Sequence, residues 1–461
     1  MHDDVIGPFA LKVGLARAVG AVSRRTGRGG GTTLPGRVLV RLEPRAIERL
    51  AARLPDGIAI VSATNGKTTT AAMTAAILGP DVPLCRNTGG ANLVSGVAST
   101  LLAAPEGARL GLLEVDEFAL PEVVTRTSPR ALLLGNLFRD QLDRYGELEL
   151  VAERWRALVT RLEASTRLVV GADDPAVGDL GDGRDGRLAY GIDDPAVARD
   201  AVEDAADTTF CVRCGAAYTY DAVYLAHLGD YRCARCGHAR PVLDLAARDV
   251  RLDGVDGSAF RLDAPDGSCE VRLGVPGLYN VENALGALSL AYALGVPTAT
   301  GAERLAGFRA AFGRFERLRA GDRDVVLLLI KNPAGANEAL RTVRDAIRES
   351  PLVLALNDRI ADGRDVSWIW DVDFEEALPA AAHVVATGTR AADLALRVRY
   401  AGTEPDRIEL LEDVERALDR GLELAGPGGT AFVLPTYTAM LELQRLVSAR
   451  GLARPYWEAR A

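Results

Sequence analysis

The sequence predicts an α/β protein with two parallel-sheet units, the second smaller than the first. Three observations support this. From Gly57 onward, short apolar runs typical of buried strands alternate with helical patterns. The alternation breaks at about residues 205–245, where two pairs of cysteines occur, and a second alternating series begins near Arg319. Alternation of this kind favours a mainly parallel sheet covered by helices on both faces.

The first unit is predicted to span residues 46–317, after an N-terminal segment, 1–45, that packs on it. The segment holds a helical pattern from Ala10 to Ser23 and a glycine-rich stretch, GRGGGTTLPG. Strands are expected to begin at Gly57, Leu110, Ala131 and Arg167, and helices over Thr68–Leu78, Leu148–Leu162 and Val281–Leu294.

The second unit is predicted to span residues 318–461 and to have a Rossmann-like α/β fold. Four apolar runs suit buried strands, and polar, helix-forming sequence lies between them. The expected strands begin at Asp324, Leu352, His383 and Gly429.

Charge and hydropathy exclude several classes of protein. A formal net charge of -9 disfavours general binding to nucleic acid or anionic lipid. No apolar run approaches the ~20 residues that cross a bilayer. The opening MHDDVIGPFALKVGL carries acids where a signal peptide needs basic residues. We therefore expect a cytoplasmic protein with no transmembrane segment.

One segment has the composition of a phosphate-binding loop. TNGKTTT, residues 64–70, follows a predicted strand and opens a predicted helix. Gly66 lets the backbone approach a phosphate, and the N–H groups at the helix start attract the anion. Lys67, one of only three lysines in the chain, would contact the β- and γ-phosphates of ATP, and Thr68 would bind Mg²⁺. The nucleotide-binding residues predicted here are Thr64, Asn65, Gly66, Lys67, Thr68 and Thr69.

This loop resembles the ATP loop of the Mur ligase family, and further motifs follow in that family's order. They are LEVDE (113–117), NLFRDQLDRYG (136–146), GLYNVENALGA (277–287) and GRFER (313–317). The resemblance implies a Mur ligase-type central ATPase domain. It also implies roles for Glu114 as a Mg²⁺ ligand and catalytic residue, for Asn280 and Asn283 beside the adenine, and for Arg314 on the nucleotide.

Gln141 replaces a histidine that often assists the metal, so the resemblance does not carry that role over to it. Two further departures from the family pattern argue against a ligase that adds an amino acid by itself. No lysine lies between Lys67 and Lys331 to take the role of the family's modified lysine. The C-terminal unit reads KNPAGAN (331–337) in place of the family's usual D-Y-A-H-N-P.

The paired cysteines have the spacing of a zinc ribbon inserted in the central domain. Cys211 and Cys214 are followed, after eighteen residues, by Cys233 and Cys236. Four thiolates form a closed tetrahedral site that is structural and favours Zn²⁺. The other two cysteines, Cys85 and Cys269, lack the setting of a nucleophile and are expected to be packing residues.

The C-terminal segments KNPAGANEAL, ALNDRIADGRDVSWIWD and LPTYTAML resemble one branch of the family, the synthetase subunits of glutamine-hydrolysing lipid II isoglutaminyl synthase. The resemblance implies amidation of the α-carboxylate of D-glutamate in lipid II through an acyl-phosphate. It also implies a heterodimer with a GatD-type glutamine amidotransferase subunit that supplies the ammonia. In that branch the synthetase contributes an aspartate to the partner's catalytic histidine. Asp358, directly after a predicted strand, is the first candidate for this catalytic role, and Asp365 is the alternative.

Two alternatives stay open at this point. A stand-alone Mur-type amino-acid ligase would share the phosphate loop and need no partner. A non-catalytic, zinc-ribbon ATPase that binds nucleic acid would show salt-dependent binding to DNA or RNA.

Overall fold

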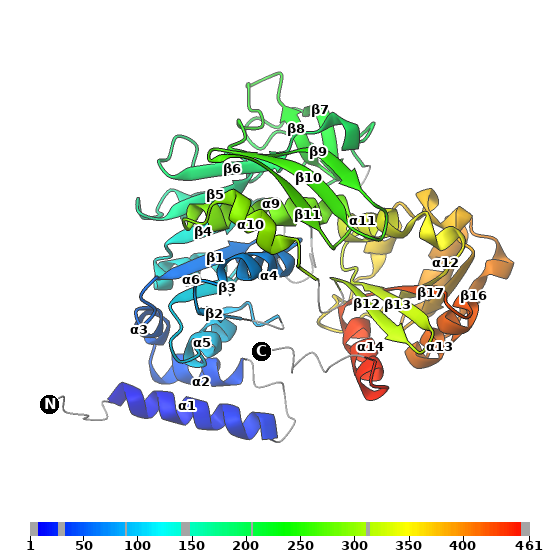
Figure 1. Cartoon of the computed structure of the whole chain (residues 1–461), viewed down its shortest axis with the longest axis horizontal. Helices are drawn as coiled ribbons and strands as arrows, with labels where there is room; N and C mark the ends of the chain where they lie inside the picture. The colour runs from blue at the N-terminus through cyan, green and yellow to red at the C-terminus, as the bar shows by residue number, and fades with distance from the viewer. Residues whose placement is uncertain are drawn as a thin grey trace.

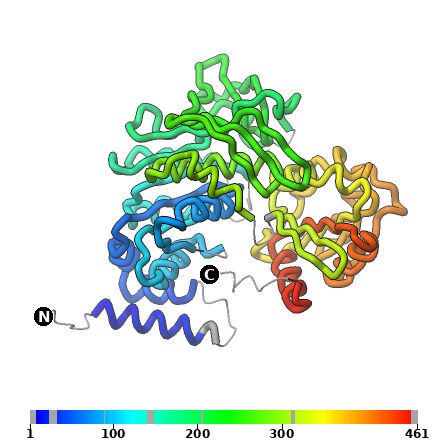
Figure 2. Tube along the Cα trace, in the orientation of Figure 1, coloured from blue at the N-terminus to red at the C-terminus, as the bar shows by residue number. Residues whose placement is uncertain are grey.

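The computed structural model describes residues 8–25, 33–87, 90–139, 148–203, 206–309 and 314–452. They form two α/β units side by side, one built before residue 310 and the other after residue 313 (Figures 1 and 2). Each unit has its own sheet, of nine and six strands respectively. The predicted α/β fold with two parallel-sheet units is confirmed.

The nine-stranded sheet has the order β11-β10-β9-β6-β5-β4-β1-β3-β2, and the strands from β9 to β2 pair in parallel. The central strands are buried on both faces, as their continuous apolar sequences require. The bounds are β1 Ile58–Ser62, β2 Leu84–Arg86, β3 Leu110–Glu114, β4 Ala131–Leu134, β5 Arg167–Gly171, β6 Arg187–Ile192 and β9 Leu245–Leu252.

One edge of this sheet is antiparallel, within the mainly parallel sheet that the sequence predicts. Strands β10 (Ser258–Ala264) and β11 (Gly267–Leu273) join β9 as antiparallel neighbours. The connections between these strands are only a few residues long, which suits hairpins, whereas a parallel crossover needs a dozen residues or more. The sheet is therefore parallel at its centre and antiparallel at the edge that follows the cysteine segment.

Helices cover both faces of the large sheet, and alternate strand residues divide between two cores. Ile58 and Ile60 pack with the N-terminal helices, whereas Ala59 and Val61 pack with α4, α9 and α10. On the first face lie α1 Pro8–Arg25, α2 Leu34–Leu42, α3 Ala46–Ala51, α5 Val94–Leu102, α6 Leu120–Thr127 and α8 Leu148–Val159. On the second lie α4 Lys67–Leu78, α9 Leu278–Ala293 and α10 Thr298–Leu305.

The cysteine segment forms a small module between β6 and β9. Its hairpin, β7 (Thr219–Leu225) and β8 (Leu228–Arg232), is a separate two-stranded sheet. Tyr218 and Tyr231 pack edge to face at the centre of the module, with ring centroids 5.2 Å apart. A domain this small needs a further constraint, such as a metal, to hold its fold.

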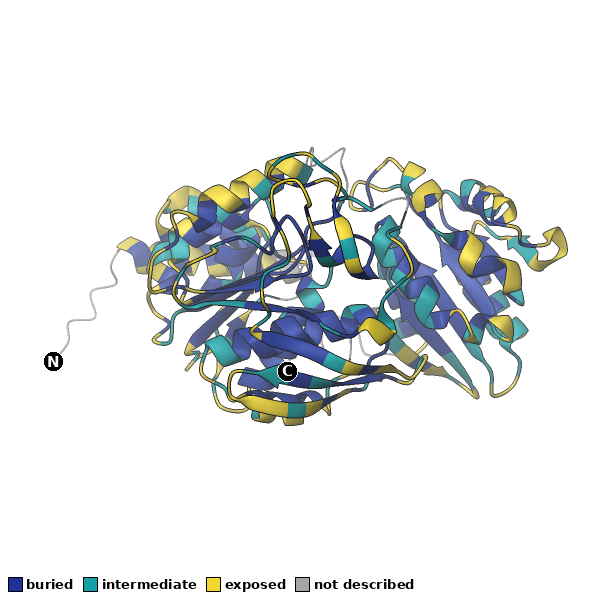
Figure 3. Cartoon of the chain, turned by 90° about the horizontal axis from the view of Figure 1, so that it is seen from above, coloured by how far each residue is buried: buried dark blue, intermediate teal, exposed yellow. Residues whose placement is uncertain are grey.

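The six-stranded sheet has the order β12-β13-β17-β14-β15-β16, with β12 antiparallel and the others parallel. Figure 3 shows its buried strands between partly exposed helices. Helices α11 and α12 pack on one face and α13 and α14 on the other. The bounds are β12 Arg314–Ala320, β13 Arg323–Leu328, α11 Pro333–Val343, β14 Pro351–Ala355, β15 His383–Thr387, α12 Ala391–Tyr400, β16 Ile408–Leu410, α13 Val414–Ala425, β17 Thr430–Pro435 and α14 Tyr437–Ala449.

None of the helices in the described part of the chain is both long and apolar enough to cross a membrane.

Candidate active site between the two sheets

The phosphate loop lies where β1 ends and α4 begins, at the carboxyl edge of the large sheet. Gly66 caps the helix with φ 81°, a backbone conformation that favours glycine. A Cβ atom at this position would stand 1.8 Å from Oδ1 of Asn283, so a larger residue would have to displace that side chain and also adopt a strained φ. The loop therefore places the start of α4, where N–H groups and the helix dipole favour an anion, at this edge of the sheet.

Lys67, the first residue of α4, is held in place by two oxygen acceptors. Its Nζ donates to the Ala63 carbonyl at 2.7 Å and to Oε2 of Glu117 at 3.1 Å. Both charged side chains are nearly buried, with exposed fractions of 10% for Lys67 and 12% for Glu117. Burial raises the pKa of Glu117, but the charges of Lys67 and Lys331 outweigh burial and lower it overall. Lys67 therefore stands charged and oriented at the end of the loop.

Glu117 is a site residue that sequence reasoning missed, although it closes the LEVDE motif. The prediction placed the Mg²⁺ ligand at Glu114, the last residue of β3. Glu114 is buried, and its backbone exchanges hydrogen bonds with the Asn87 side chain at 2.6 and 2.8 Å. Thr68, the other predicted Mg²⁺ ligand, follows Lys67 and is half-buried. A hydroxyl and carboxylates are the hard oxygen donors that Mg²⁺ prefers, so these residues suit the ion.

Asn136, after β4, fixes the shape of the loop. Its Oδ1 accepts from the Asn65 N–H at 2.9 Å, and its Nδ2 donates to the Asn65 carbonyl at 3.2 Å. Next to it, the Phe138 N–H donates to Oγ1 of Thr64 at 3.1 Å. Gln141, quoted from the same motif, lies outside the described residues.

The two predicted adenine-side asparagines form a chain of hydrogen bonds at the start of α9. Asn283 Nδ2 donates to Oδ1 of Asn280 at 3.1 Å, and Asn280 Nδ2 donates to the Pro276 carbonyl at 2.7 Å. Oδ1 of Asn283 accepts from the Thr70 hydroxyl at 3.2 Å. Asn280 is thus a buried support, while Asn283 reaches the loop.

The C-terminal unit touches the phosphate loop directly. Lys331 Nζ donates to the Thr64 carbonyl at 3.0 Å, and Asn332 Nδ2 donates to Oδ1 of Asn65 at 2.9 Å. Asn332 also caps α11 by accepting from the Gly335 N–H. No signal in the sequence paired these segments, which are 267 residues apart.

Between the units lies a cleft of about 910 Å³, counting the space open to solvent. Its loop side carries Asn65, Gly66, Thr69, Asn136 and Asn283. Its other walls are mostly apolar and come from the segment after β4, α9, the cysteine module and the C-terminal unit. They include Phe138, Leu225, Leu228, Tyr279, Phe315, Leu328 and Ala339. A polar loop beside apolar walls suits a nucleotide, whose phosphates are charged and whose base is flat and apolar. The side chain of Arg314, predicted to reach the nucleotide, lies outside the described residues.

The four cysteines of the module converge on one point. Their sulfur atoms all lie within 4.8 Å of one another, with two pairs at 3.5 Å. Zn–S bonds of about 2.3 Å in a tetrahedron place sulfurs about 3.8 Å apart, so the four donors fit Zn²⁺. Burial acts to raise the pKa of Cys211, but backbone N–H groups of Arg213 and Cys214 lower it to about 5, which favours the thiolate a metal needs.

Asp358 does not line the cleft and is partly exposed. It follows β14 at the carboxyl edge of the small sheet, and its side chain is 35% exposed. The Thr389 hydroxyl, at 2.9 Å, and the Arg390 guanidinium, at 3.4 Å, lower the pKa of its carboxyl. The alternative, Asp365, is exposed and accepts from the Ser367 N–H. Neither acid is buried.

Solved structures of similar fold are ligases. A pseudomurein peptide ligase type C from Methanothermus fervidus aligns with a TM-score of 0.66 and 21% identity, over 88% of this chain and 80% of that one. MurF from Acinetobacter baumannii aligns with a TM-score of 0.65 and 17% identity, over 90% and 80%. MurF from Thermotoga maritima, solved in complex with ADP, gives 0.61 and 15%, over 93% and 85%. At these low identities the alignments show a shared fold, which is that of the Mur ligases.

Sequence comparisons extend this to the family. The model of the Mur ligase middle domain matches residues 61–291, and that of the MurT ligase C-terminal domain matches residues 329–440. Two relatives carry the name lipid II isoglutaminyl synthase (glutamine-hydrolyzing) subunit MurT. The one from Streptococcus pneumoniae is 32% identical over 94% of this chain and 95% of its own length, and the one from Staphylococcus aureus is 29% identical over 92% and 94%. The chain belongs to the Mur ligase family, in the group of MurT subunits.

Proposed function

We propose that this ligase makes D-isoglutamine in lipid II by amidating the α-carboxylate of the D-glutamate residue. ATP phosphorylates the carboxylate, and ammonia displaces phosphate from the resulting acyl-phosphate. The relatives named as MurT subunits support lipid II as the substrate. The observation that carries the proposal is the cleft, where Lys67 of the large sheet and Lys331 of the small one both reach the phosphate loop.

The two lysines suit phosphoryl transfer, which depends on positioning and on neutralising negative charge. Lys67 would contact the β- and γ-phosphates, and the N–H groups at the start of α4 would hold them. Mg²⁺, when bound beside Thr68 and Glu114, would offset further charge, and Glu117 keeps the Lys67 ammonium aimed at the loop. Asn283, with Asn280 behind it, would lie against the adenine.

Ammonia needs a protected source, because ammonia released into neutral water is protonated and loses its nucleophilic electron pair. We assign this source to a GatD-type glutamine amidotransferase in a heterodimer, in keeping with the word subunit in the relatives' names. Asp358 would orient the partner's catalytic histidine, as the acid of a triad does. The reaction would take place in the cytoplasm, at the inner face of the membrane that carries lipid II.

The test is co-purification with a candidate glutaminase followed by an amidation assay on lipid II with ATP, Mg²⁺ and glutamine. Mass spectrometry of the peptide is expected to show amidation with both subunits present. The chain alone is expected to amidate only when ammonium salt replaces glutamine.

Two outcomes would reject the proposal. Product formation from a precursor, ATP and an amino acid, with no second subunit, would favour a stand-alone ligase. Salt-dependent binding of DNA or RNA without any amidation would favour a nucleic-acid-binding ATPase.

A further inference from the structure

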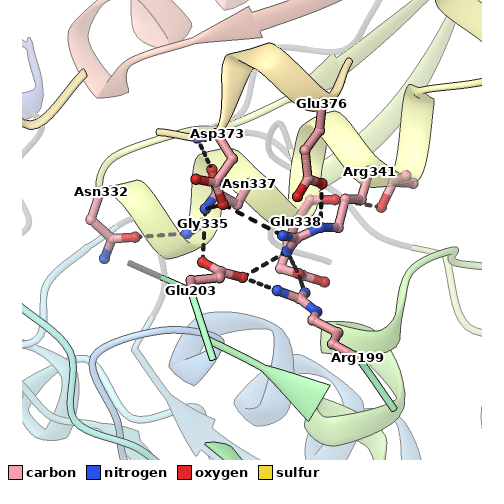
Figure 4. Close-up of polar contacts among 10 residues, drawn as sticks. Arg199, Glu203, Asn332, Gly335, Asn337, Glu338, Arg341, Asp373 and Glu376 are labelled. Atoms are coloured by element: carbon pink, nitrogen blue, oxygen red, sulfur yellow. Dashed lines mark hydrogen bonds and ion pairs between the residues drawn. The ribbon is translucent and has the colours of Figure 1, made fainter. Parts of the chain in front are cut away.

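A group of charged side chains joins the two units beside the cleft. Arg199 and Glu203 come from the segment before the cysteine module, and Glu338 and Arg341 come from α11 (Figure 4). Arg199 pairs with both Glu203 and Glu338. Arg341 Nη1 donates to Oε1 of Glu203 and to Oε1 of Glu338, each at 2.8 Å. We call these four residues the interdomain clamp.

The clamp is largely shielded from water, so its ion pairs are screened less than surface pairs. The exposed side-chain fractions are 17% for Arg199, 7% for Glu203, 12% for Glu338 and 24% for Arg341. Further acceptors surround it, because Asp373 and Glu376 lie 3.6 and 3.5 Å from Arg341. With Asp373 and Glu376 counted, four acids surround the two arginines, so removing one arginine leaves repulsion across the boundary between the units.

The clamp holds the helix that closes the cleft. Asn332, which caps α11, bonds Asn65 of the phosphate loop. Glu338 lies about 9 Å farther along the same helix, at 1.5 Å per residue. Between these two points Ala334 and Gly335 line the cleft, and so does Glu338 itself. Helix α11 is therefore held at its start by the Asn332–Asn65 contact and farther along by the clamp, and Lys331, just before Asn332, is held with it.

Arg199 also ties the clamp to the cysteine module. Its backbone N–H donates to the Val223 carbonyl of β7 at 2.7 Å, in an antiparallel bridge. The turn after β7 brings Leu225, Ala226 and Leu228 to the wall of the cleft. The metal-binding module, the clamp and the nucleotide wall thus form one connected structure.

We propose that Arg199 is a positioning residue that holds the C-terminal unit closed over the nucleotide, using the cysteine module as its platform. This inference rests on the proposed function for the existence of a nucleotide in the cleft. When Arg199 is replaced, the closed state is less populated, and the apparent affinity for nucleotide falls by the same factor. Saturating nucleotide restores closure, because nucleotide binds the closed state better.

The test uses Arg199→Met in the full, zinc-loaded chain, with calorimetric titration of the non-hydrolysable analogue AMP-PNP. The dissociation constant is expected to rise about tenfold or more. Small-angle scattering is expected to show a more extended molecule without nucleotide and the wild-type shape with saturating AMP-PNP. A variant damaged only in its fold would not regain that shape. Arg199→Lys should lie between, because one ammonium cannot reproduce the guanidinium fork.

The matched control is Arg232→Met, which removes an exposed arginine of the β7–β8 hairpin, the hairpin that Arg199 bridges, and whose partner is Asp221. Arg341→Met tests the clamp from the other unit and should reproduce the Arg199→Met result. A dissociation constant within twofold of wild type in both clamp variants would overturn the proposal, and so would an equal change in the control. If the wild-type chain binds no AMP-PNP, the proposed function fails before the clamp is tested.

Discussion

The carboxyl edges of the two parallel sheets carry charged pairs in opposite surroundings. At the large sheet, Lys67 and Glu117 have exposed fractions of 10% and 12%. At the small sheet, Arg390 and Asp358 have exposed fractions of 33% and 35%. A buried charge acts strongly on a small ligand that fills its pocket, whereas an exposed acid gains strength only when a second surface covers it. The same topology thus places an enclosed charged pair at one edge and an exposed one at the other.

Removing the enclosed charge should have the largest effect. In Lys67→Ala the γ-phosphate loses its ammonium, and amidation is expected to fall about 10³-fold with either glutamine or ammonium salt. Lys12→Ala is the matched control, because Lys12 pairs with Glu43 and neither residue lines the cleft. Near-normal turnover of lipid II in Lys67→Ala would contradict the expectation that the enclosed charge matters more than the exposed one.

Replacing the exposed Asp358 should reduce amidation with glutamine but not amidation with ammonium salt. In Asp358→Asn the partner's histidine loses its orienting charge, and glutamine-dependent amidation is expected to fall about 10²-fold, less than for a complete triad within one chain. Amidation with ammonium salt should stay within about twofold. Asp365→Asn is the comparison variant, and a loss there with none in Asp358→Asn would move the role to Asp365.

The cysteine cluster should affect stability more than chemistry. Cys233→Ser is expected to lose bound zinc and to lower the melting temperature by about 5–10 °C, because metal binding contributes folding free energy. Metal analysis and thermal unfolding measure this. Cys269→Ser, at a lone half-buried thiol, should change neither. A wild-type protein purified without metal would contradict the assignment.

The smallest expected effect concerns acid stability and compares the two acids directly. The folded-state pKa of Glu117 is lowered, so its ionised form stabilises the fold above the ordinary pKa of 4.5, and this is lost as the pH falls through the lower, folded value. At pH 7, Glu117→Gln should be less stable by about 2 kcal/mol. The difference in the free energy of unfolding between Glu117→Gln and the wild type should become smaller as the pH is lowered, and urea titrations at several pH values measure it. For Asp358→Asn, at the exposed edge, this difference should be smaller at every pH.

Much of this architecture could be predicted because its signals are local. The strand before Thr64, the TNGKTTT segment that opens a helix, and each CxxC pair lie within a few neighbouring residues. The strand–loop–helix and the four converging sulfurs therefore occur where the sequence predicts them, and the role of the loop in nucleotide binding stays a prediction.

The remainder depends on contacts between distant segments. Asn65 meets Asn332, and Arg199 meets Glu338, across more than 130 residues of chain. Charged residues are common in this sequence, and nothing local marks Arg199 among its arginines. Glu117 was within reach, because an acid three residues after Glu114 and just past the strand end can turn back toward the loop. The antiparallel edge of β10 and β11 was also missed, since apolar alternation alone does not give strand direction.

The small sheet carries both Lys331, beyond the end of β13, and Asp358, beyond the end of β14, with only β17 between these strands. Neighbouring strands lie about 4.8 Å apart, so the two residues ride on one stiff plate roughly 10 Å across. Any movement of the small sheet relative to the large one would therefore displace Lys331 and Asp358 together.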